Sequence, residues 1–574
     1  MTATEAAITL PEAVEVLIVG AGPVGAALAN LCGRLGIETL LVDRLAEIQT
    51  DPRAIALDNE ALRVLQNVGL SEESFDKVRI DQVTLRSPRF GLFARMNTAR
   101  ELDTHPMLIT FFQPQLERAL HAALGQYDNV RCIRPVECLA VSQSDEGCVA
   151  TLRDASGAEQ PVRARFVVAA EGARSPIRHT LGLAFGGSTY EEDWLIVDAL
   201  NVAQPIDHVD FYCDPRRPSP QMPAPGGRQR WEFMLRKDES AEAVLAADNI
   251  RTLLAERGVD DDPAIERKAV YRFHARVAER FRVGRILLAG DAAHVTPPFA
   301  GQGLVAGLRD AFNLAWKLKW ALDGRSAETV LESYNTERKP HAWEMIRLAQ
   351  WMGGMIMPTS QLAALFSQGS ARLMMLIPPL RKKIVNLENK PQNRFAKGLF
   401  AARPARWRSL FGATGSSYER GNHLMQGWLV AGAESSERAA SAIEMTGKSS
   451  AESSGYSAVA TDMDNANVSG VVVRSDDVLG LRLQLLGINV DPMALLSPAQ
   501  LRTWLSLAGH TAAIAKPDCA DALPEAYIDR DDSFPLGPNG EPWLVVVRPD
   551  KVVVTDGPVA SLAQMLEQAR LLLE

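Results

Sequence analysis

Three short segments of this 574-residue chain combine glycines with carboxylates or arginines, and each directly follows an apolar run. GAGPVG begins at Gly20, EGARSPIR begins at Glu171, and GDAAHVTPPFAGQG begins at Gly290. Glycines at a turn let the backbone come close to a ligand, free N–H groups at a helix start favour anions, and carboxylates accept hydrogen bonds from hydroxyls. This combination indicates a binding site for a phosphate-containing cofactor that also has free hydroxyl groups.

The first segment matches the pattern G-x-G-x-x-G at Gly20, Gly22 and Gly25. In this pattern the first glycine allows a tight turn, the second lets the backbone approach a pyrophosphate, and the third lets the helix pack closely on the strand. A β-branched run over 15–19 predicts the strand, and the helix is expected over 24–35. The sequence therefore predicts a dinucleotide-binding strand, turn and helix.

A second strand is expected over 39–42, and Asp43 closes it about 20 residues beyond the first glycine, where such motifs carry an acid. A carboxylate there hydrogen-bonds the ribose hydroxyls of an adenosine and favours an unphosphorylated ribose. NAD and FAD both fit this description. Pro23 and Arg44, which adjoin these residues, are further candidate cofactor contacts.

The third segment begins as an expected strand over 286–289 and breaks at Gly290 and Asp291. It passes a proline-rich turn at 296–298 and a second glycine pair, and then enters a helix whose apolar face runs over 304–318. An acid at the end of a strand, followed by the N–H groups of a helix start, suits a cofactor with hydroxyls and an electron-rich end. An ordinary strand–turn–helix crossover would show the same pattern, so this segment alone leaves both interpretations open.

Several polar residues outside the first and third segments are also candidates. Arg53 precedes an apolar stretch and could reach a flavin or a phosphate, and Gln113 at an expected helix start could donate to a cofactor oxygen. In the second segment, Glu171, Gly172 and Arg174 could hold a pyrophosphate and meet a reduced nicotinamide nucleotide. A solvated arginine, a surface glutamine and a salt-bridged loop are the alternatives.

Composition and charge argue against several classes of protein. A net charge of −9 and a pI of about 5.7 argue against nucleic-acid binding, which needs a basic face. Six cysteines without a C-x-x-C pair signal neither a zinc site nor a dithiol site, and they fit a reducing cytoplasm. The acidic N-terminus does not resemble a signal peptide, and glycines interrupt the uncharged stretch 16–33. We therefore expect a cytoplasmic protein without membrane insertion.

The order of the three segments resembles the class A flavin-dependent aromatic hydroxylases, the superfamily of para-hydroxybenzoate hydroxylase and phenol hydroxylase. Within that family, the sequences PRAIALDNEALR, HVDFYCDPRRP, RWEFML and DAFNLAWKL resemble members that act on 3-(3-hydroxyphenyl)propionate. The resemblance is strong through about residue 345 and weaker beyond. It implies bound FAD, with NADH or NADPH and O2 as co-substrates.

The implied reaction is hydroxylation of a phenolic acid ortho to its hydroxyl, in aromatic catabolism. The implied substrates are 3-(3-hydroxyphenyl)propionate and 3-hydroxycinnamate, which give 2,3-dihydroxyphenyl products. Another phenol as substrate, a non-hydroxylating FAD reductase and a redox-sensing flavoprotein are the alternatives. No set of metal ligands is visible in the sequence.

The resemblance also implies roles for single residues. The three glycines of the first segment would meet the FAD pyrophosphate, Asp43 the adenosine ribose, and Asp291 the ribityl chain. The helix start after the third segment would place backbone N–H groups near flavin N1 and O2. Glu171 stands where the family usually has Asp. The expected cofactor contacts are Gly20, Gly22, Pro23, Gly25, Asp43, Arg44, Arg53, Gln113, Glu171, Gly172, Arg174, Gly290, Asp291, Pro298, Gly301, Gln302, Gly303 and Leu304.

The sequence gives weaker signals for catalytic and substrate-binding residues than for cofactor contacts. A dry, rigid turn at Pro297, Pro298 and Phe299 would shield the reacting oxygen from water. Ile55 stands where phenol hydroxylases place an acid near the ring. The candidate catalytic residues are Arg53, Tyr271, His294 and Pro298, and the candidate substrate contacts are His208, Tyr212, Arg216 and Arg230. Structural histidines, half-buried sheet residues and surface charges are the alternatives for these positions.

The expected fold class is α/β, with a Rossmann-like FAD-binding domain of the para-hydroxybenzoate hydroxylase type. The expected parts are this FAD domain (14–182 and 272–345), an inserted antiparallel substrate sheet (183–271), a helical connection (346–432), a flexible linker or insertion (433–470) and a thioredoxin-like C-terminal domain (471–574). The last part lacks a C-x-x-C pair, so packing or subunit contact is its expected role. We expect a homo-oligomer, a dimer.

Overall fold

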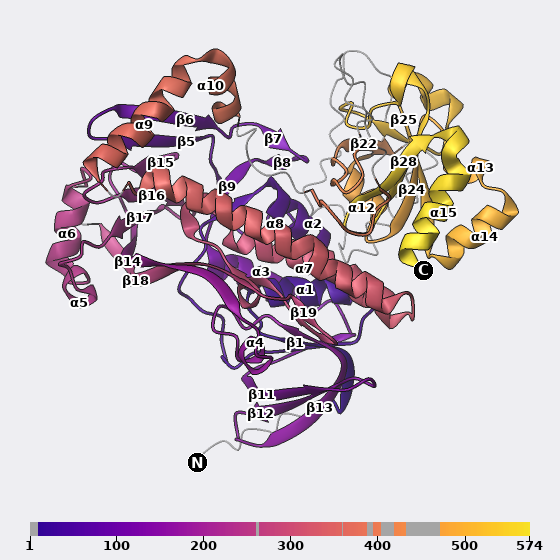
Figure 1. Cartoon of the computed structure of the whole chain (residues 1–574), viewed down its shortest axis with the longest axis horizontal. Helices are drawn as coiled ribbons and strands as arrows, with labels where there is room; N and C mark the ends of the chain where they lie inside the picture. Colours follow the sequence, from indigo (N-terminus) through magenta and orange to yellow (C-terminus); the bar gives the residue numbers. More distant parts are fainter. Residues whose placement is uncertain (1–9, 260–262, 359, 387–393, 403–417, 432–470) are drawn as a thin grey trace.

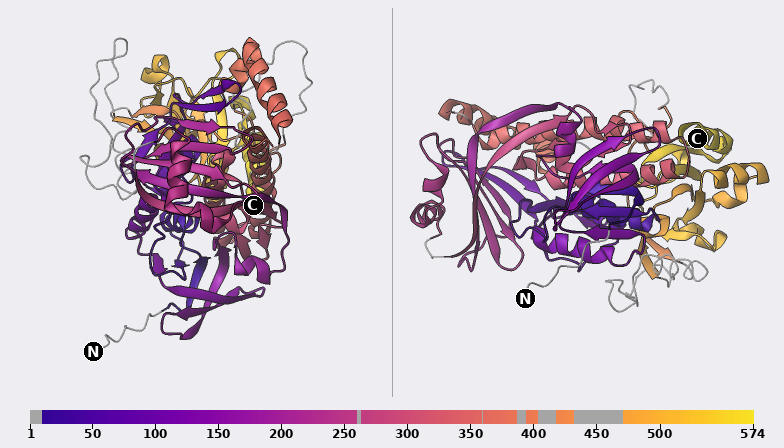
Figure 2. Two further views of the ribbon diagram at one scale, coloured as in Figure 1. Left: turned by 90° about the vertical axis from the view of Figure 1, so that its left-hand side faces the viewer. Right: turned by 90° about the horizontal axis from the view of Figure 1, so that it is seen from below.

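The computed structural model describes residues 10–259, 263–358, 360–386, 394–402, 418–431 and 471–574. Three large sheets organise them. A mainly parallel sheet lies between an antiparallel sheet and a C-terminal sheet along the long axis of the molecule (Figures 1 and 2). Among the described helices, none is at once long and apolar enough to cross a membrane.

The parallel sheet is built from the strands that the sequence predicts. Its parallel strands are β1 (Ala13–Val19), β2 (Thr39–Val42), β10 (Val130–Ile133), β13 (Glu159–Ala169) and β20 (Ile286–Leu288). Antiparallel pairing adds β11 (Val136–Gln143), β12 (Cys148–Asp154) and β19 (Arg282–Val283). Ile18 pairs with Leu41 on one side and with Val168 on the other, and Val168 pairs with Leu287. These strands therefore end level with one another, and the three glycine-containing segments emerge at one edge.

Helices cover this sheet because each presents an apolar face at helical spacing. They include α1 (Pro23–Arg34), α2 (Asn59–Val68), α3 (Gln113–Leu124), α4 (Pro176–Thr180) and α7 (Gly303–Leu322). Small strands β3 (Ala56–Asp58), β4 (Lys77–Arg79), β7 (Glu101–Leu102), β8 (His105–Pro106) and β9 (Leu108–Phe111) lie in the same part of the chain. α1 packs directly on α7, so the first and third segments are held side by side.

The antiparallel sheet draws on more of the chain than the predicted insertion 183–271. Its strand order is β21-β18-β14-β17-β16-β15-β5-β6. The strands are β5 (Gln82–Ser87), β6 (Gly91–Asn97), β14 (Phe185–Leu200), β15 (Val209–Tyr212), β16 (Ser219–Ala224), β17 (Arg228–Met234), β18 (Ala264–Ala278) and β21 (His294–Val295). β5 joins through a parallel pairing with β15. Such a pairing between distant segments leaves no local pattern in the sequence, which explains why β5 and β6 were not assigned to this sheet.

Helices cover both faces of this sheet. The outer face packs on α5 (Ala241–Val244) and α6 (Ala247–Ala255). The inner face is covered by the end of α8 (Ala327–Ile356), and by α9 (Gln361–Leu376), which is followed by α10 (Pro378–Val385). α8 continues past residue 345, so one helix spans the predicted end of the FAD domain and the start of the helical connection. α9 and α10 lie over β5 and β6 (Figure 1).

The C-terminal sheet has seven strands in the order β23-β22-β26-β25-β24-β27-β28. They are β22 (Trp428–Ala431), β23 (Val471–Arg474), β24 (Leu483–Ile488), β25 (Gly509–Ala515), β26 (Tyr527–Asp529), β27 (Trp543–Val547) and β28 (Val553–Pro558). The helices are α12 (Ser475–Leu479), α13 (Pro492–Leu495), α14 (Pro498–Ser506) and α15 (Leu562–Leu573). The predicted linker 433–470 lies outside the described residues, and a thioredoxin-like fold for this part stays a prediction.

A buried cluster of charges joins the C-terminal sheet to α7 and α8. The Glu337 carboxylate accepts from Lys317 Nζ at 2.7 Å and from Arg548 Nη1 at 2.6 Å. Arg548 also donates to Asp550 at 2.5 Å, and all four side chains are almost fully buried. Burial opposes ionisation, but Arg548 and Lys317 hold the pKa of Glu337 well below its usual range. Removing one member of such a cluster leaves buried charges without partners.

Replacing Glu337 with Gln is therefore expected to destabilise the junction by about 3–5 kcal/mol, because Arg548 stays charged and buried while Lys317 loses the carboxylate that favours its protonation. Thermal unfolding followed by far-UV circular dichroism measures the change in midpoint. The control is Glu567→Gln, which breaks a surface pair with Arg570 and is expected to leave the midpoint almost unchanged. Equal midpoints for the two variants would contradict a stabilising role for the cluster.

Candidate active site

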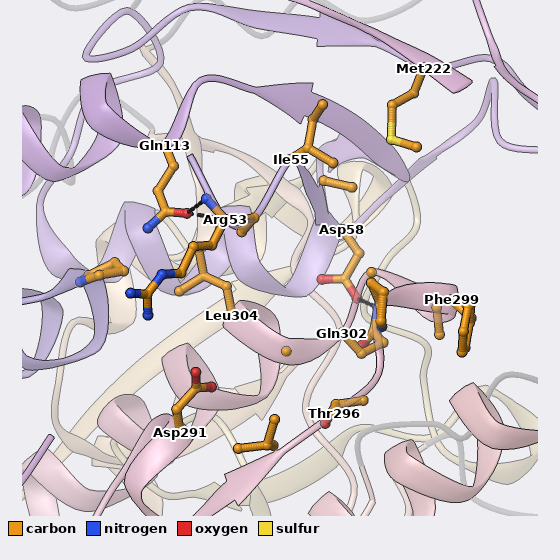
Figure 3. A pocket seen from close by; sticks show the side chains of 18 of the residues that line it. Arg53, Ile55, Asp58, Gln113, Met222, Asp291, Thr296, Phe299, Gln302 and Leu304 are labelled. Carbon is orange, nitrogen blue, oxygen red and sulfur yellow. Dashed lines mark hydrogen bonds between the residues drawn. The ribbon is translucent and has the colours of Figure 1, made fainter. Parts of the chain in front are cut away.

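A cavity of about 660 Å³ lies between the edge of the parallel sheet and the inner face of the antiparallel sheet. The three glycine-containing segments line one end of it, and strands β5, β6, β15, β16 and β17 line the other. Figure 3 shows Arg53 and Asp291 facing each other across the first end, with Ile55 and Met222 farther away. One continuous space therefore joins a polar compartment to an apolar one.

The turn before α1 provides a site for a pyrophosphate. Gly22 caps the helix and has open space where a side chain would begin, so a ligand can approach the free backbone N–H groups. Gly20 has a φ of 106°, and a Cβ there would lie 2.3 Å from the carbonyl oxygen of Ala170. A Cβ on Gly25 would lie 1.9 Å from the carbonyl oxygen of Gly20. Gly25 therefore serves the packing of helix on strand, and it does not line the cavity.

Asp43 is fixed at the end of β2 by two backbone groups. Ala21 N donates to its Oδ2 at 2.8 Å, and Leu45 N donates to its Oδ1 at 2.8 Å. Each carboxylate oxygen keeps a second lone pair, and the residue lines the cavity. The geometry therefore leaves Asp43 able to accept hydrogen bonds from the hydroxyls of a ribose.

The loop that carries Arg53 is held from two sides. Gln113 Oε1 accepts from the backbone N–H groups of Arg53 at 2.9 Å and Ala54 at 2.7 Å (Figure 3). On the other side, Arg230 donates to the carbonyl oxygens of Pro52 at 3.0 Å and Arg53 at 3.3 Å. Gln113 lines the cavity, and its side chain fixes the loop that presents Arg53.

Two acids near the GDAAH turn, Asp310 and Asp291, have different surroundings. Asp310 on α7 accepts from the backbone of Gly290 at 3.0 Å, contacts His294 Nε2 at 2.7 Å and accepts from Arg338 at 2.8 Å. His294 is buried in this network and does not line the cavity. Asp291 does line it, and within the described part of the chain no hydrogen bond reaches its carboxylate. Burial raises the pKa of Asp291, as expected for a carboxylate that awaits a ligand.

The start of α7 forms the floor of the polar compartment. Gln302 caps this helix, and its side chain donates to Asp58 at 3.2 Å, which turns it away from the helix start. The backbone N–H groups at Gly303 and Leu304 line the cavity and have no intrahelical acceptor. The positive end of the helix dipole faces the same space. The site thus offers a pyrophosphate-binding turn, two acids for hydroxyls and an anion-favouring helix start, and these features fit FAD.

The apolar compartment is lined largely by aliphatic and aromatic side chains and is rich in methionine. Leu85 pairs with both Ala94 and Phe211 across neighbouring strands, so their side chains share the inner face of the sheet. The lining residues here are Ile55, Val83, Leu85, Ala94, Met96, Val209, Phe211, Pro220, Met222, Glu232, Phe299, Met352, Met355 and Met374. Apart from Ile55 and Phe299, these residues are not predicted from the sequence, because they come from distant strands and from α8 and α9, whose packing leaves no local pattern.

Most of the predicted cofactor contacts come together around this cavity. Those that line it are Gly20, Gly22, Pro23, Asp43, Arg44, Arg53, Gln113, Glu171, Gly172, Asp291, Pro298, Gly301, Gln302, Gly303 and Leu304. Arg174 and Gly290 do not line it. A Cβ on Gly290 would lie 3.0 Å from Val24, so this glycine allows α1 to approach the turn.

The predicted substrate contacts lie outside the cavity lining, contrary to expectation. Arg216 donates to Asp214 at 2.8 Å, His208 contacts Asp207 at 2.8 Å, and the Tyr212 ring lies 4.2 Å from the Arg257 guanidinium. Asp207 and Asp214 stand one and two residues from the side chains that they contact, and Arg257 follows α6. Residue spacing in the sequence does not reveal these contacts.

Arg230 and Tyr271 belong to a buried network beside the cavity and do not line it. Arg230 donates to Asp198 at 2.6 and 2.9 Å, and Arg267 donates to Asp198 at 3.2 Å and to the Tyr271 hydroxyl at 2.5 Å. Arg230 therefore acts on the Arg53 loop, and the Tyr271 hydroxyl is already engaged. In the described residues no group of three or more His, Cys, Asp or Glu side chains could hold a metal ion.

Two family models match the chain. The model described as an FAD binding domain matches residues 13–349, more than half of the chain, and it contains all three glycine-containing segments. The model described as the HcaD C-terminal domain matches residues 464–571.

Curated relatives extend over nearly the whole chain. A 3-(3-hydroxy-phenyl)propionate/3-hydroxycinnamic acid hydroxylase of Burkholderia cenocepacia is 34% identical over 96% of this chain and 95% of its own length. A protein of the same name from Comamonas testosteroni is 37% identical over 67% of this chain and 66% of its own length.

Solved structures share the fold. The flavin-dependent monooxygenase PieE, solved with FAD and substrate, has a TM-score of 0.72 at 19% identity and covers 98% of this chain and 99% of its own. Aklavinone-11 hydroxylase, solved with FAD and aklavinone, has a TM-score of 0.70 at 20% identity, with 97% and 98% covered. The expected α/β fold with an FAD-binding domain is thus confirmed. The chain belongs to the FAD-dependent aromatic monooxygenases, the family that includes the 3-(3-hydroxyphenyl)propionate hydroxylases.

Proposed function

We propose that this enzyme hydroxylates 3-(3-hydroxyphenyl)propionate and 3-hydroxycinnamate ortho to the phenol hydroxyl, giving 2,3-dihydroxyphenyl products in aromatic catabolism. The observation that carries the proposal is the continuous cavity of about 660 Å³, which joins a site whose residues fit FAD to a compartment lined by apolar side chains. The hydroxylase of Burkholderia cenocepacia, which aligns with this chain over 95% of its length, is named for these substrates.

When bound, FAD supplies electron transfer from NADH or NADPH and the activation of O2 for transfer of one oxygen atom to the ring. The protein binds and orients the reactants. The turn at Gly22 binds the pyrophosphate, Asp43 accepts from the ribose hydroxyls, and Asp291 accepts from the ribityl hydroxyls. The start of α7 at Gly303 stabilises negative charge at the edge of the ring system that faces it.

Exclusion of water is the second task of the protein, because activated oxygen that meets water is lost as H2O2. Phe299 follows Pro298 in the turn and is 3% exposed. Its ring packs edge to face on Tyr190 at 5.7 Å, Trp194 at 5.9 Å and Phe273 at 5.8 Å. This aromatic cluster anchors the turn against the antiparallel sheet, so Pro298 presents a rigid apolar wall to the cavity.

We also propose a cytoplasmic homodimer. All six cysteines lie in the described residues and none forms a disulfide, which supports a reducing compartment. Leu362, Phe366, Leu373 and Leu376 on α9 are each at least 60% exposed, which supports contact between subunits at that helix. Sedimentation analysis of the purified protein tests the oligomeric state.

The purified protein is expected to be yellow and to consume NADH or NADPH and O2 in a 1:1 ratio when 3-(3-hydroxyphenyl)propionate is added. Mass spectrometry should identify the 2,3-dihydroxyphenyl product in the same amount. A panel of phenols without the acid chain serves as the comparison. Absence of substrate-dependent O2 uptake across the panel would refute hydroxylation and favour a reductase or a redox sensor, and preference for another phenol would correct the substrate.

Asp291→Asn is expected to weaken FAD binding by about 10–100-fold, because a charged acceptor for the ribityl hydroxyls is lost. The unliganded protein should unfold at the same temperature as wild type or higher. Burial raises the pKa of Asp291, so its ionised form destabilises the empty site at neutral pH. Flavin fluorescence titration measures the affinity, and the exposed Asp248→Asn is the control. Unchanged affinity in Asp291→Asn would remove Asp291 from the binding site.

A further inference from the structure

Glu232 on β17 is a carboxylate on the inner face of the antiparallel sheet. It pairs with Ile196 of β14, and it stands two residues beyond Arg230, which pairs with Met222 of β16. Side chains alternate along a strand, so Glu232 faces the same side as Met222, whereas Trp231 and Phe233 face α6 on the other side. Glu232 and Met222 both line the cavity. The strand register therefore places a carboxylate in the wall of the apolar compartment.

This carboxylate is buried without a dedicated partner. Glu232 is 8% exposed, and within the described residues no hydrogen bond or ion pair reaches it. Its neighbours in the cavity wall include Phe211, Pro220 and Met222, none of which offers a side-chain hydrogen-bond donor. A buried polar group without a partner is costly, so its presence in a ligand cavity points to a donor that the ligand supplies.

The charged side chains around Glu232 form hydrogen bonds with one another. Arg230 on the same strand donates to Asp198 of β14 at 2.6 and 2.9 Å. Arg267 of β18 donates to Asp198 at 3.2 Å and to the Tyr271 hydroxyl. Burial raises the pKa of Glu232 to about 7, Arg230 and Arg267 oppose this rise, and Asp198 adds to it. The group can therefore gain or lose a proton near neutral pH.

We propose that Glu232 accepts the hydrogen bond of the substrate's phenol hydroxyl and takes its proton as the ring is hydroxylated. This inference rests on the proposed function, and it names a catalytic residue for that reaction. The substrate's own carboxylate would be repelled by an ionised Glu232, so the phenol end of the substrate faces β17. Lys383 of α10 also lines the cavity, and α10 packs on β6, three strands beyond β16. Lys383 provides a positive charge for the carboxylate end of the substrate.

The proton balance is closed. The phenol O–H bond breaks, its electron pair stays on the phenol oxygen, and an O–H bond forms on Glu232. The ring gains electron density, so its ortho carbon attacks the electrophilic oxygen more readily. The hydrogen displaced from that carbon moves to the original phenol oxygen and restores aromaticity. The proton held by Glu232 is consumed when the second atom of O2 becomes water, which returns the carboxylate.

The test compares Glu232→Gln with wild type, using 3-(3-hydroxyphenyl)propionate and its analogue 3-phenylpropionate, which lacks the phenol hydroxyl. Gln has nearly the same shape but cannot take a proton. We expect kcat to fall about 100-fold or more, in the range of general-base catalysis, with FAD content unchanged. Wild-type kcat/KM should rise with pH through about 7 as Glu232 ionises in the free enzyme, and this dependence should be absent in Glu232→Gln.

Binding of the two ligands, followed by the flavin absorbance change, provides a readout that does not require turnover. Wild type should prefer the hydroxylated ligand at least tenfold above pH 7, and Glu232→Gln should lose most of this preference while binding 3-phenylpropionate as wild type does. Glu232→Asp should recover part of kcat. The control is Glu266→Gln, whose carboxylate pairs with Arg228 and does not line the cavity.

The outcomes separate the inference from the proposed function. If wild type hydroxylates the phenol and Glu232→Gln keeps its kcat within about threefold and its pH dependence, the inference is wrong and the proposed function stands. If wild type hydroxylates no phenol, the proposed function is wrong, and the ligand preference then decides whether Glu232 contacts the hydroxyl. Equal preference in wild type and Glu232→Gln would exclude that contact.

Discussion

Parallel pairing of β1 with β2 and β13, and of β13 with β20, determines where the chemistry takes place. The paired residues Val19, Val42, Ala169 and Leu288 end these strands level with one another. The candidate cofactor contacts directly follow them, so residues separated by more than 250 positions meet at one edge. Gly20 and Gly25 maintain this arrangement. A Cβ on Gly20 would clash with the backbone of Ala170 at the end of β13, and a Cβ on Gly25 would press helix α1 away from Gly20. The remaining features of the site depend on that edge being intact.

The antiparallel sheet adds an apolar compartment to the cavity that the glycine-containing segments line. Its inner face supplies an apolar wall opposite the flavin site, and the Phe299 cluster ties the proline turn of the parallel part to that wall. Arg230 links the same sheet to the Arg53 loop through two backbone carbonyls. The two compartments are thus mechanically connected, and a shift of one sheet relative to the other would change the position of Arg53.

Two acids in the cavity, Asp291 and Glu232, differ from the buried acids Glu337 and Asp310. Glu337 and Asp310 are each surrounded by donors, and neighbouring cations lower their pKa values despite burial. Asp291 and Glu232 have no such partners within the described residues, and burial raises their pKa values. Carboxylates of the first kind hold the fold together. Those of the second kind are destabilising until a ligand provides a donor, and this contrast distinguishes site residues from structural ones.

The sequence by itself predicted the cofactor half of the candidate site, and most of the residues predicted for it line one cavity. Strand, glycine turn, helix and acid are local patterns, and Gly22, Asp43 and Asp291 could be assigned because each stands at a fixed place relative to a strand end. The substrate half depended on the tertiary structure. His208, Tyr212 and Arg216 looked suitable from residue type, yet their side chains meet nearby partners and lie outside the cavity. Glu232 gave no signal, because the face of a strand and the pairing of β17 with β14 and β16 are fixed only when distant segments align.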